Sequence, residues 1–395
     1  MKILIVSPGR LPVPAVRGGA VETLIDLLVE YNEHSGMHEL WVVSAWDPES
    51  EKRAQNYRHA RFLYLKQGFL YSKISERHLI PYRMLDHVYS NRALHMLDKT
   101  QKNYDIIVIE NELVNGSVFM KRLPGRYIYH AHNDTLEVQN KRDIAFLRSC
   151  DKVLTISDYL GEQLRFRAGL SNIDIVYNGV DTILFDRKKV QDQASEKRKQ
   201  FGLSSEDFVI AFAGRLVEEK GIGVLAEAIM QIPESYRVVL LIIGSSFFGK
   251  NTDTPFIRKL KSLERSGSGR ILFTGYVKHT EMPVYYAMAD VGCVPSLWDE
   301  PFGLTVAEQM AMELPVVTTD AGAIPEIVDS TCGFICQRDD QLNKNIASAI
   351  TTLSRNRGMC REMGKNGRKT IENRFSCTKY CANWFESVRM GETKE

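Results

Sequence analysis

The sequence predicts an α/β fold with two domains, each built around a parallel β-sheet. The chain has 395 residues, which is too long for one hydrophobic core and favours two domains of about 200 residues each. Short runs rich in Val, Ile, Leu, Phe and Tyr alternate with helical segments, as they do in β-α-β units. This alternation begins twice along the chain, so we expect one doubly wound sheet in each half.

The strands are predicted in two series. The first series comprises residues 2–6, 40–44, 62–65, 105–109, 127–130, 152–156 and 173–177. The second series comprises residues 208–213, 238–243, 271–274, 291–295 and 316–319. Helical segments then fill the end of the chain, and the last of them, residues 378–389, has an apolar stripe that requires a surface to pack against. The residues of that stripe are Tyr380, Trp384, Phe385 and Val388.

The domain boundary is predicted within a polar stretch. Residues 186–200 are crowded with Lys, Asp, Gln and Arg and lack apolar periodicity, which is typical of an interdomain linker. We therefore predict a first domain over residues 1–188 and a second domain over residues 189–375.

The composition is that of a globular protein that does not cross a membrane. The chain is 44% hydrophobic and 25% charged, and its longest strongly apolar run, residues 238–243, is far shorter than the roughly 20 residues that span a bilayer. The apolar run at the N-terminus is too brief for a signal peptide. The seven cysteines are odd in number and scattered, which fits a reducing compartment. We therefore expect a cytoplasmic protein.

The charge is uneven, although the net charge is only +2. Residues 51–102 contain eleven Lys or Arg and four Asp or Glu. Such a segment could lie against an anionic membrane surface or receive a diphosphate-bearing acceptor. An ordinary solvated surface is an equal alternative. Nucleic-acid binding is not expected, because the protein as a whole is not basic and the segment lacks a defined platform of aromatic residues.

Ligands bind a doubly wound sheet at the carboxyl ends of its strands. The loop after the first strand ends in Gly18-Gly19, directly before a helix with apolar residues at i, i+3, i+4 and i+7. Glycines at a helix N-terminus let backbone N–H groups approach a phosphate. The spacing is not that of a dinucleotide fingerprint, and a simple turn is an equal alternative.

The loop after the strand at 208–213 carries two cations, Arg215 and Lys220, in the sequence Gly-Arg-Leu-Val-Glu-Glu-Lys-Gly. Two cations five residues apart can contact a diphosphate from different sides and offset the charge of a leaving group without a metal ion. Solvated surface cations are the alternative interpretation.

The most specific motif is Glu-Pro-Phe-Gly-Leu-Thr-Val-Ala-Glu, from Glu300 to Glu308. If the segment were helical, its two carboxylates would lie roughly 12 Å apart along the axis, too far for an acid and a base acting on one bond. That separation suits one carboxylate on a donor sugar and the other on a ribose. The N–H groups of Gly303, Leu304 and Thr305 would face the phosphates between them.

Two histidines lie two positions apart: His130 ends the strand at 127–130, and His132 is in the loop after it. Strand alternation puts both side chains on one face, and a histidine at the carboxyl end of a strand can bond a reacting hydroxyl. A histidine pair could also bind a metal ion, but the sequence offers no obvious third ligand. We therefore favour a substrate contact over a metal site.

These motifs resemble glycosyltransferase family 4 in residue type, order and spacing over nearly the whole chain. The resemblance also includes Tyr177-Asn178-Gly179-Val180-Asp181, Phe273-Thr274-Gly275-Tyr276-Val277 and the turn at residues 321–326. It implies a GT-B fold, in which two Rossmann-like domains face each other across an interdomain cleft. The donor binds the second domain and the acceptor the first, and a returning helix at residues 376–395 completes the first domain. Within this family, the chain resembles the members that are linked to bacterial spore-coat or surface-polysaccharide synthesis.

The resemblance also implies residue roles. Arg215 and Lys220 would stabilise the leaving diphosphate, Glu300 would bind the donor sugar, Glu308 the ribose, and backbone near Tyr276 and Val277 the base. His132 would lie beside the reacting sugar, which makes Arg215, Lys220, Glu300 and His132 the expected catalytic residues. The remaining donor contacts that it implies are Gly18, Gly19, Gly244, Phe302, Gly303, Leu304 and Thr305.

The expected reaction is therefore a retaining sugar transfer from a nucleotide-sugar donor to a glycan or a polyprenyl-diphosphate-linked acceptor. No metal and no other cofactor is expected, because the sequence contains no Asp-x-Asp pair, and Glu110-Asn111-Glu112 is interpreted as a loop lining the acceptor side. Two alternatives stay open: a nucleotide-sugar epimerase of the same fold, and a non-catalytic coat or scaffold protein descended from a transferase. The four charged donor residues favour transfer.

Overall fold

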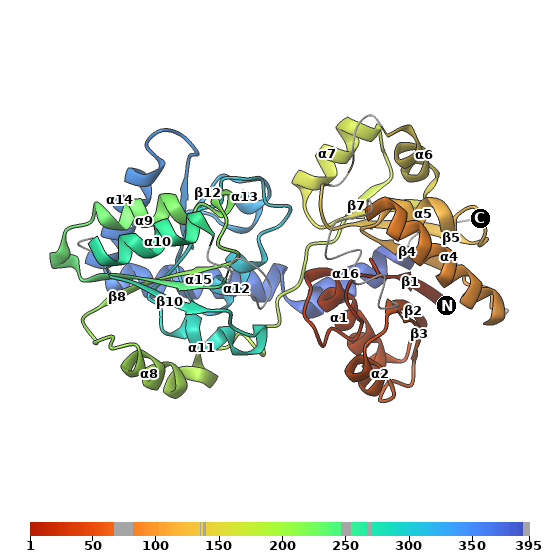
Figure 1. The fold of residues 1–395 in the computed structure, drawn as a ribbon, viewed down its shortest axis with the longest axis horizontal. Coiled ribbons are helices and arrows are strands. Elements are labelled where there is room, and N and C mark those ends of the chain that lie inside the picture. Colours follow the sequence, from red (N-terminus) through yellow and green to blue (C-terminus); the bar gives the residue numbers. More distant parts are fainter. Residues whose placement is uncertain are drawn as a thin grey trace. The chain divides into compact units, whose positions relative to one another are not determined.

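The computed structural model describes residues 1–66, 82–100, 102–134, 136, 140–245, 254–266 and 270–389. The chain forms two compact units, here called the first unit and the second unit (Figure 1). The first unit comprises Met1–Gly179 and Tyr380–Glu395, and the second comprises Val180–Lys379. The division thus falls between Gly179 and Val180 rather than after residue 188.

The first unit contains one parallel sheet of seven strands in the order β3-β2-β1-β4-β5-β6-β7. The strands are β1 (Lys2–Val6), β2 (Glu39–Ala45), β3 (Ala60–Leu65), β4 (Ile106–Glu110), β5 (Arg126–Ala131), β6 (Lys152–Thr155) and β7 (Ile173–Ile175). The helices are α1 (Ala20–Ser35), α2 (Pro48–Ala54), α4 (Tyr82–Thr100), α5 (Leu113–Phe119), α6 (Lys141–Ser149), α7 (Asp158–Ala168) and α16 (Cys377–Arg389). All seven predicted strands are present.

The second unit repeats this architecture with six parallel strands in the order β10-β9-β8-β11-β12-β13. They are β8 (Phe208–Ala213), β9 (Val238–Ile243), β10 (Arg270–Gly275), β11 (Val291–Val294), β12 (Val316–Thr319) and β13 (Gly333–Cys336). The helices are α8 (Gln191–Gln200), α9 (Ile222–Met230), α10 (Pro255–Ser266), α11 (Met282–Ala287), α12 (Leu304–Ala311), α13 (Ile324–Ile327), α14 (Leu342–Arg355) and α15 (Arg357–Arg374). Four short 3₁₀ turns lie between them: η1 (Arg187–Val190), η2 (Glu218–Lys220), η3 (Glu234–Tyr236) and η4 (His279–Glu281). Two doubly wound parallel sheets confirm the predicted fold class, and β13 is an additional edge strand.

The last helix, α16, packs into the core of the first unit. Its four predicted apolar residues are buried in the cluster that also holds the inward faces of α1, β1 and β2. The Lys152 ammonium group donates to the Ser387 carbonyl oxygen at 2.9 Å, and the Cys381 thiol donates to the Leu27 carbonyl oxygen at 3.5 Å. The apolar stripe of α16 is thus covered by the unit that contains the N-terminus.

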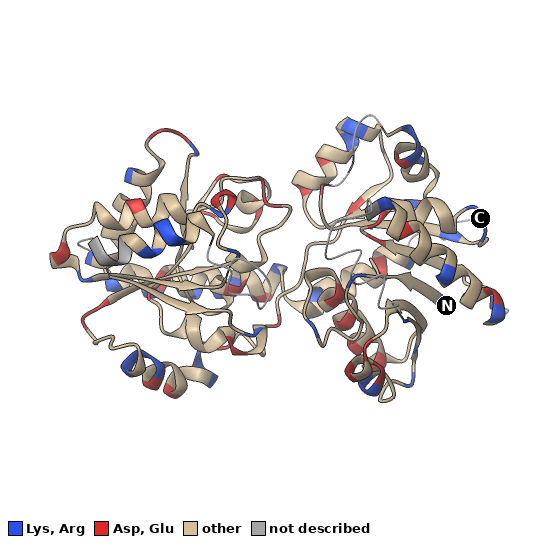
Figure 2. Cartoon of the chain, in the orientation of Figure 1, with Lys and Arg blue, Asp and Glu red and all other residues tan. Residues whose placement is uncertain are grey.

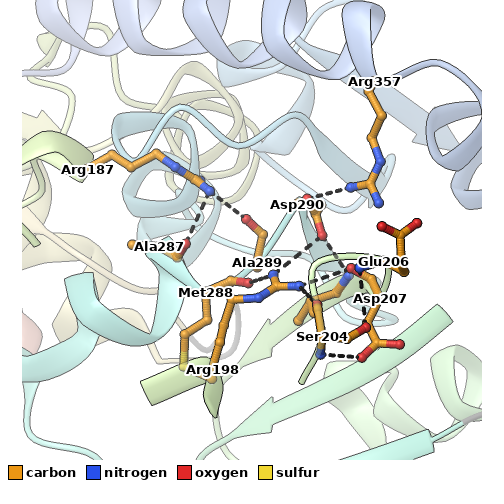
Figure 3. Close-up of polar contacts among 11 residues, drawn as sticks. Arg187, Arg198, Ser204, Glu206, Asp207, Ala287, Met288, Ala289, Asp290 and Arg357 are labelled. Atoms are coloured by element: carbon orange, nitrogen blue, oxygen red, sulfur yellow. Dashed lines mark hydrogen bonds and ion pairs between the residues drawn. The ribbon is translucent and has the colours of Figure 1, made fainter. Parts of the chain in front are cut away.

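The interpretation of residues 186–200 as a linker is wrong. These residues form η1 and α8 and belong to the second unit, where two arginines fix them to the end of α11 (Figure 3). Arg187 donates to the carbonyl oxygens of Ala287 at 3.1 Å and Ala289 at 2.9 Å, and Arg198 donates to that of Met288 at 2.6 Å. The last carbonyl groups of a helix have no partner within the helix. Two of the polar residues in this segment thus satisfy backbone carbonyl groups, and only Ala194 of α8 is buried.

Candidate functional site

The strand order of each sheet reverses beside its first strand, between β1 and β4 and between β8 and β11. A ligand crevice of a doubly wound sheet lies outside the carboxyl ends of the strands at such a point. The predicted site residues follow these strands. By contrast, a pocket of about 520 Å³ in the second unit is lined by residues before the amino ends of β8, β11 and β12, by four residues of α15 and by Arg187. It contains none of the predicted site residues.

The centre of the candidate donor site is an ion pair between Lys220 and Glu300. Lys220 ends η2, after β8, and Glu300 lies in the loop between β11 and α12. The Lys220 ammonium group donates to Glu300 Oε1 at 2.7 Å, and the Ser296 hydroxyl donates to the same oxygen at 2.8 Å. The Lys220 ammonium group also lies 5.0 Å from the ring centroid of Trp298. Both charged side chains are mostly buried, so the pair is held in place and desolvated.

The N-terminus of α12 follows this pair directly. Gly303 precedes the helix with φ 104°, and no side-chain hydrogen bond from this N-cap residue satisfies the first backbone N–H groups. Leu304 and Thr305, the first two residues of the helix, are half-buried. Phe302 is buried and packs edge-to-face on Phe375, with ring centroids 5.8 Å apart. Phe302 therefore anchors the loop, while the free N–H groups of α12 can meet an anion.

Glu308, in the middle of α12, is already engaged at both carboxylate oxygens. Oε1 lies 2.7 Å from His279 Nε2, and Oε2 accepts a hydrogen bond from the Tyr286 hydroxyl at 3.2 Å. The hydrogen bond to Glu308 raises the pKa of His279 above its usual value. His279 and Tyr286 lie on the elements that follow β10, so they place Glu308 near the loop that begins with Tyr276.

Arg215 forms an ion pair of its own, with a residue other than Lys220 or Glu300. It is half exposed, and its guanidinium group pairs with Glu219 Oε1 at 3.0 Å. Glu219 was not predicted to have any role. A diphosphate that binds Arg215 would have to compete with this neighbouring carboxylate or share the guanidinium group with it.

Glycines bring the ends of three neighbouring strands together. Gly214, Gly244 and Gly275 end or follow β8, β9 and β10, and all three have positive φ. A Cβ atom on Gly244 would lie 2.0 Å from the Gly214 carbonyl oxygen. Tyr276 and Val277 continue from Gly275, with the side chain of Tyr276 exposed and that of Val277 half-buried. The exposed Tyr276 thus follows directly on Gly275, beside the close approach of Gly244 to Gly214.

We expect Gly244→Ala to destabilise the second unit by about 1–3 kcal/mol, because the new methyl group meets backbone and φ 146° is unfavourable for alanine. Urea denaturation would measure the change. Gly223→Ala is the matched control. Its new Cβ atom would make only an ordinary contact, with the Phe256 side chain at 3.5 Å. Gly223 lies in α9, where alanine is favoured over glycine by up to about 1 kcal/mol. Equal stability of the two variants would contradict the predicted close approach of the strand ends.

His132 lies in the first unit in a buried cluster with Glu110 and His130, here called the Glu110 cluster. Glu110 ends β4, His130 lies opposite it on β5, and His132 follows β5. Glu110 Oε2 is 2.7 Å from His132 Nε2 and 3.0 Å from His130 Nδ1. Burial and the neighbouring His130 lower the pKa of His132, so its ring is neutral near pH 7. The two histidines outweigh burial and lower the pKa of Glu110, which is therefore ionised.

Gly18 and Gly19 lie at the start of α1, as predicted, and have φ values of 76° and 100°. A Cβ atom on Gly19 would meet Glu22 Oε2 at 2.3 Å. Glu22 is buried in the first turn of α1, and burial raises its pKa to about 7. This carboxyl group beside the glycines was not predicted, and it reduces the attraction of the α1 N-terminus for an anion when it is ionised.

The structure thus joins some predicted residues and adds partners to others. It pairs Lys220 with Glu300 within the second unit, whereas His132, Gly18 and Gly19 lie in the first unit. The partners that sequence reasoning missed are Glu219, His279, Tyr286, Ser296 and Glu110. Three of them stood in segments after strands, the kind of position that indicated the predicted residues: Glu219 follows β8, His279 follows β10 and Ser296 follows β11.

Two family models match the two units in turn. Glycosyltransferase Family 4 matches residues 17–184, and Glycosyl transferases group 1 matches residues 193–370. The chain is 26% identical to spore coat protein SA of Bacillus subtilis over 393 residues, which cover 97% of this chain and 98% of that protein. It is 32% identical over 197 residues to the capsular polysaccharide biosynthesis glycosyltransferase CapM of Staphylococcus aureus, a match that covers 49% of each chain.

The fold is also similar to a solved structure of Anabaena Alr3699/HepE in complex with UDP. The TM-score is 0.74 at 21% identity, and the match covers 99% of this chain and 100% of that one. The family matches, both Rossmann-like units and the residues at the carboxyl ends of their strands agree with one another. The chain therefore belongs to the glycosyltransferases that combine a family 4 domain with a group 1 domain, and it is a glycosyltransferase of the GT-B type.

Proposed function

We propose that this glycosyltransferase takes a sugar from a nucleotide diphosphate sugar, with a UDP-sugar favoured over a GDP-sugar. It transfers the sugar, with retention of anomeric configuration, to a hydroxyl group of a glycan or lipid-linked acceptor. The Lys220–Glu300 pair carries the donor part of this proposal. A desolvated cation and a carboxylate that touch each other beside a free helix N-terminus provide, in one place, groups for a phosphate and for sugar hydroxyls.

The residues divide the work along the donor. The Lys220 ammonium group and the Arg215 guanidinium group neutralise the diphosphate as it leaves, with the N–H groups of Leu304 and Thr305 as further donors. Glu300 accepts hydrogen bonds from sugar hydroxyls, and Glu308 accepts them from the ribose. Because cations and N–H groups already neutralise the diphosphate, its departure needs no metal ion. We expect turnover to be unchanged by added magnesium or manganese.

Retention follows if the acceptor hydroxyl attacks from the face that the diphosphate leaves. The acceptor oxygen forms the new glycosidic bond, the bond from the sugar to the phosphate oxygen breaks, and a phosphate oxygen takes the acceptor proton. His132 contacts the reacting sugar in this proposal, since a neutral ring can exchange hydrogen bonds with hydroxyl groups.

We place the reaction in cell-surface polysaccharide synthesis in the cytoplasm, on an acceptor at the inner face of the membrane. The names of spore coat protein SA and of CapM support this setting, and the complex of HepE with UDP supports a UDP-sugar. No helix among residues 1–66, 82–100 and the later described ranges is long and apolar enough to cross a membrane. A contact with an anionic membrane surface through the basic segment at residues 51–102 is part of the proposal, and residues 67–81 and 101 of that segment lie outside the described residues.

Donor binding and donor hydrolysis test the function. The protein would be heated with UDP, GDP, TDP or ADP, and each ligand that raises its melting temperature would be followed by hydrolysis of the corresponding nucleotide sugars. We expect stabilisation by UDP and slow release of sugar that Glu300→Gln abolishes. Absence of stabilisation by all four nucleotides would contradict the proposal and favour a coat or scaffold role. Conversion of the bound sugar to its epimer without transfer would favour the epimerase.

We also expect UDP affinity to rise with pH across the pKa of His279. Below that raised pKa, the protonated ring forms an ion pair with Glu308 that the ribose must displace or share. As the pH rises through this raised pKa, the ring loses its proton and its hold on Glu308 weakens. Calorimetric titration at several pH values measures the effect. His279→Gln keeps the titration of the ligand's phosphate and should lose the additional dependence; an equal pH dependence in both proteins would contradict the role of His279.

A further inference from the structure

The Glu110 cluster has the composition of a metal site. Two imidazole rings and one carboxylate converge from two adjacent parallel strands, and all three side chains are at most 5% exposed. One ligand atom from each residue can be chosen so that all three lie within 4.8 Å of one another. Among the described residues, Glu110, His130 and His132 form the group of His, Cys, Asp or Glu side chains whose ligand atoms come this close together.

Hydrogen bonding within the cluster leaves several buried polar atoms without a partner. Glu110 Oε2 lies beside both rings, whereas Glu110 Oε1 has no hydrogen-bond partner among the described residues. His130 Nε2 and His132 Nδ1 also have no hydrogen-bond partner among the described residues, and His130 Nδ1 has only its contact with Glu110 Oε2 at 3.0 Å. Buried polar groups are nearly always hydrogen-bonded or bound to an ion, so three unpartnered atoms in one buried cluster require an explanation. A cation among these atoms would supply a partner that the described residues lack.

We propose that the Glu110 cluster binds a divalent transition metal ion, with zinc as the expected occupant. The ligands are Glu110, His130 and His132, which leaves a fourth position for water or another ligand. Imidazole nitrogen suits zinc better than magnesium or calcium, and two histidines with one carboxylate are an established zinc ligand set.

The spacing of the ligand atoms is close to that of a zinc site. A tetrahedral zinc ion with bonds of about 2.0–2.1 Å holds its ligand atoms roughly 3.3 Å apart. The distances of 2.7 Å and 3.0 Å from Glu110 Oε2 to the two rings need to open by only a few tenths of an ångström. Because the ligands stand on β4, on β5 and directly after β5, the ion would tie together the carboxyl ends of two neighbouring strands.

The residues proposed to bind the diphosphate belong to the second unit, but the cluster shares His132 with the proposed function. As a zinc ligand, His132 would be held by the ion instead of exchanging hydrogen bonds with the reacting sugar. Zinc binding itself can be measured whether or not the chain transfers a sugar. It also changes the interpretation of the histidine pair, because Glu110 is the third ligand that the sequence did not reveal. In the sequence, Glu110 is 20 residues before His130, and only the strand register places them opposite each other.

The test uses the full-length chain without a histidine tag. After treatment with a chelator and dialysis, the protein would be equilibrated with zinc and, separately, with cobalt, and its metal content measured by mass spectrometry. We expect about one equivalent of either metal and the intense visible absorption of cobalt in a tetrahedral site. We also expect zinc to raise the melting temperature, because a ligand that binds only the folded state stabilises it.

Two ligand variants and one control separate this site from adventitious binding. Glu110→Gln keeps the shape of the side chain and His130→Ala removes one ring; each should weaken zinc binding by at least about 100-fold. His95→Ala removes an exposed histidine on α4 and should bind zinc as the natural protein does. Circular dichroism would show that each variant is folded. If the folded natural protein takes up less than about a tenth of an equivalent of zinc and cobalt, the proposal is overturned and the cluster is a hydrogen-bonded network only. Equal binding by Glu110→Gln and the natural protein would overturn it as well.

Discussion

Lys220→Ala is expected to lower turnover of the nucleotide-sugar donor by about 100- to 1,000-fold, the range found when one donor to a developing negative charge is removed. The Lys220 ammonium group is held at 2.7 Å from Glu300 and over the ring of Trp298, so it is oriented before the donor arrives. Its charge matters most as the diphosphate leaves. Turnover at saturating donor should therefore fall more than donor affinity, and steady-state kinetics measure both.

Two further variants make this result specific. Arg215→Ala should also lower turnover, but by less, because its guanidinium group is half exposed and shared with Glu219. Lys344→Ala removes an exposed lysine on α14 of the same unit and should leave kcat and KM unchanged. If Lys220→Ala raised KM and left kcat unchanged, Lys220 would contribute uniform binding and no stabilisation of the leaving group.

The sheets could be predicted from the sequence because buried parallel strands are continuous apolar runs. The strands at 208–213, 238–243 and 316–319 have the predicted bounds, and every residue in them is buried. Residues 333–336 were missed, since the four-residue strand Gly-Phe-Ile-Cys begins with glycine and is too short for a periodic signal. Residues 186–200 were misassigned because the partners of Arg187 and Arg198 are carbonyl groups about 100 residues away in the sequence, which no local pattern reveals.

The site was predictable to the extent that its chemistry lies in loops after strands. Lys220 and Glu300 were identified in this way, yet their contact across 80 positions of sequence is a property of the strand order. Glu308 was expected to bind a ribose, and the structure adds two protein partners for its carboxylate that the sequence did not reveal. These pairings depend on which strands are neighbours and on their register, so residue types and spacing within one loop could not show them.

The largest expected loss of stability comes from Trp384→Ala, at about 3–5 kcal/mol for the first unit. Trp384 is fully buried in α16, and its ring packs edge-to-face on Phe385 with centroids 4.9 Å apart. Removing the indole leaves a cavity between a helix from the end of the chain and a core built from its beginning. Urea denaturation followed by circular dichroism would measure the shift of the first unit's transition.

The matched control lies on the same helix. Glu386→Ala changes an exposed position of α16 and should alter stability by no more than about 0.5 kcal/mol. Because Trp384 belongs to the first unit and the donor residues to the second, Trp384→Ala should still be stabilised by UDP at temperatures where it is folded. A loss below about 1 kcal/mol would mean that α16 does not complete the core of the first unit in solution. Loss of UDP binding in a folded Trp384→Ala protein would mean that the donor site depends on the first unit as well.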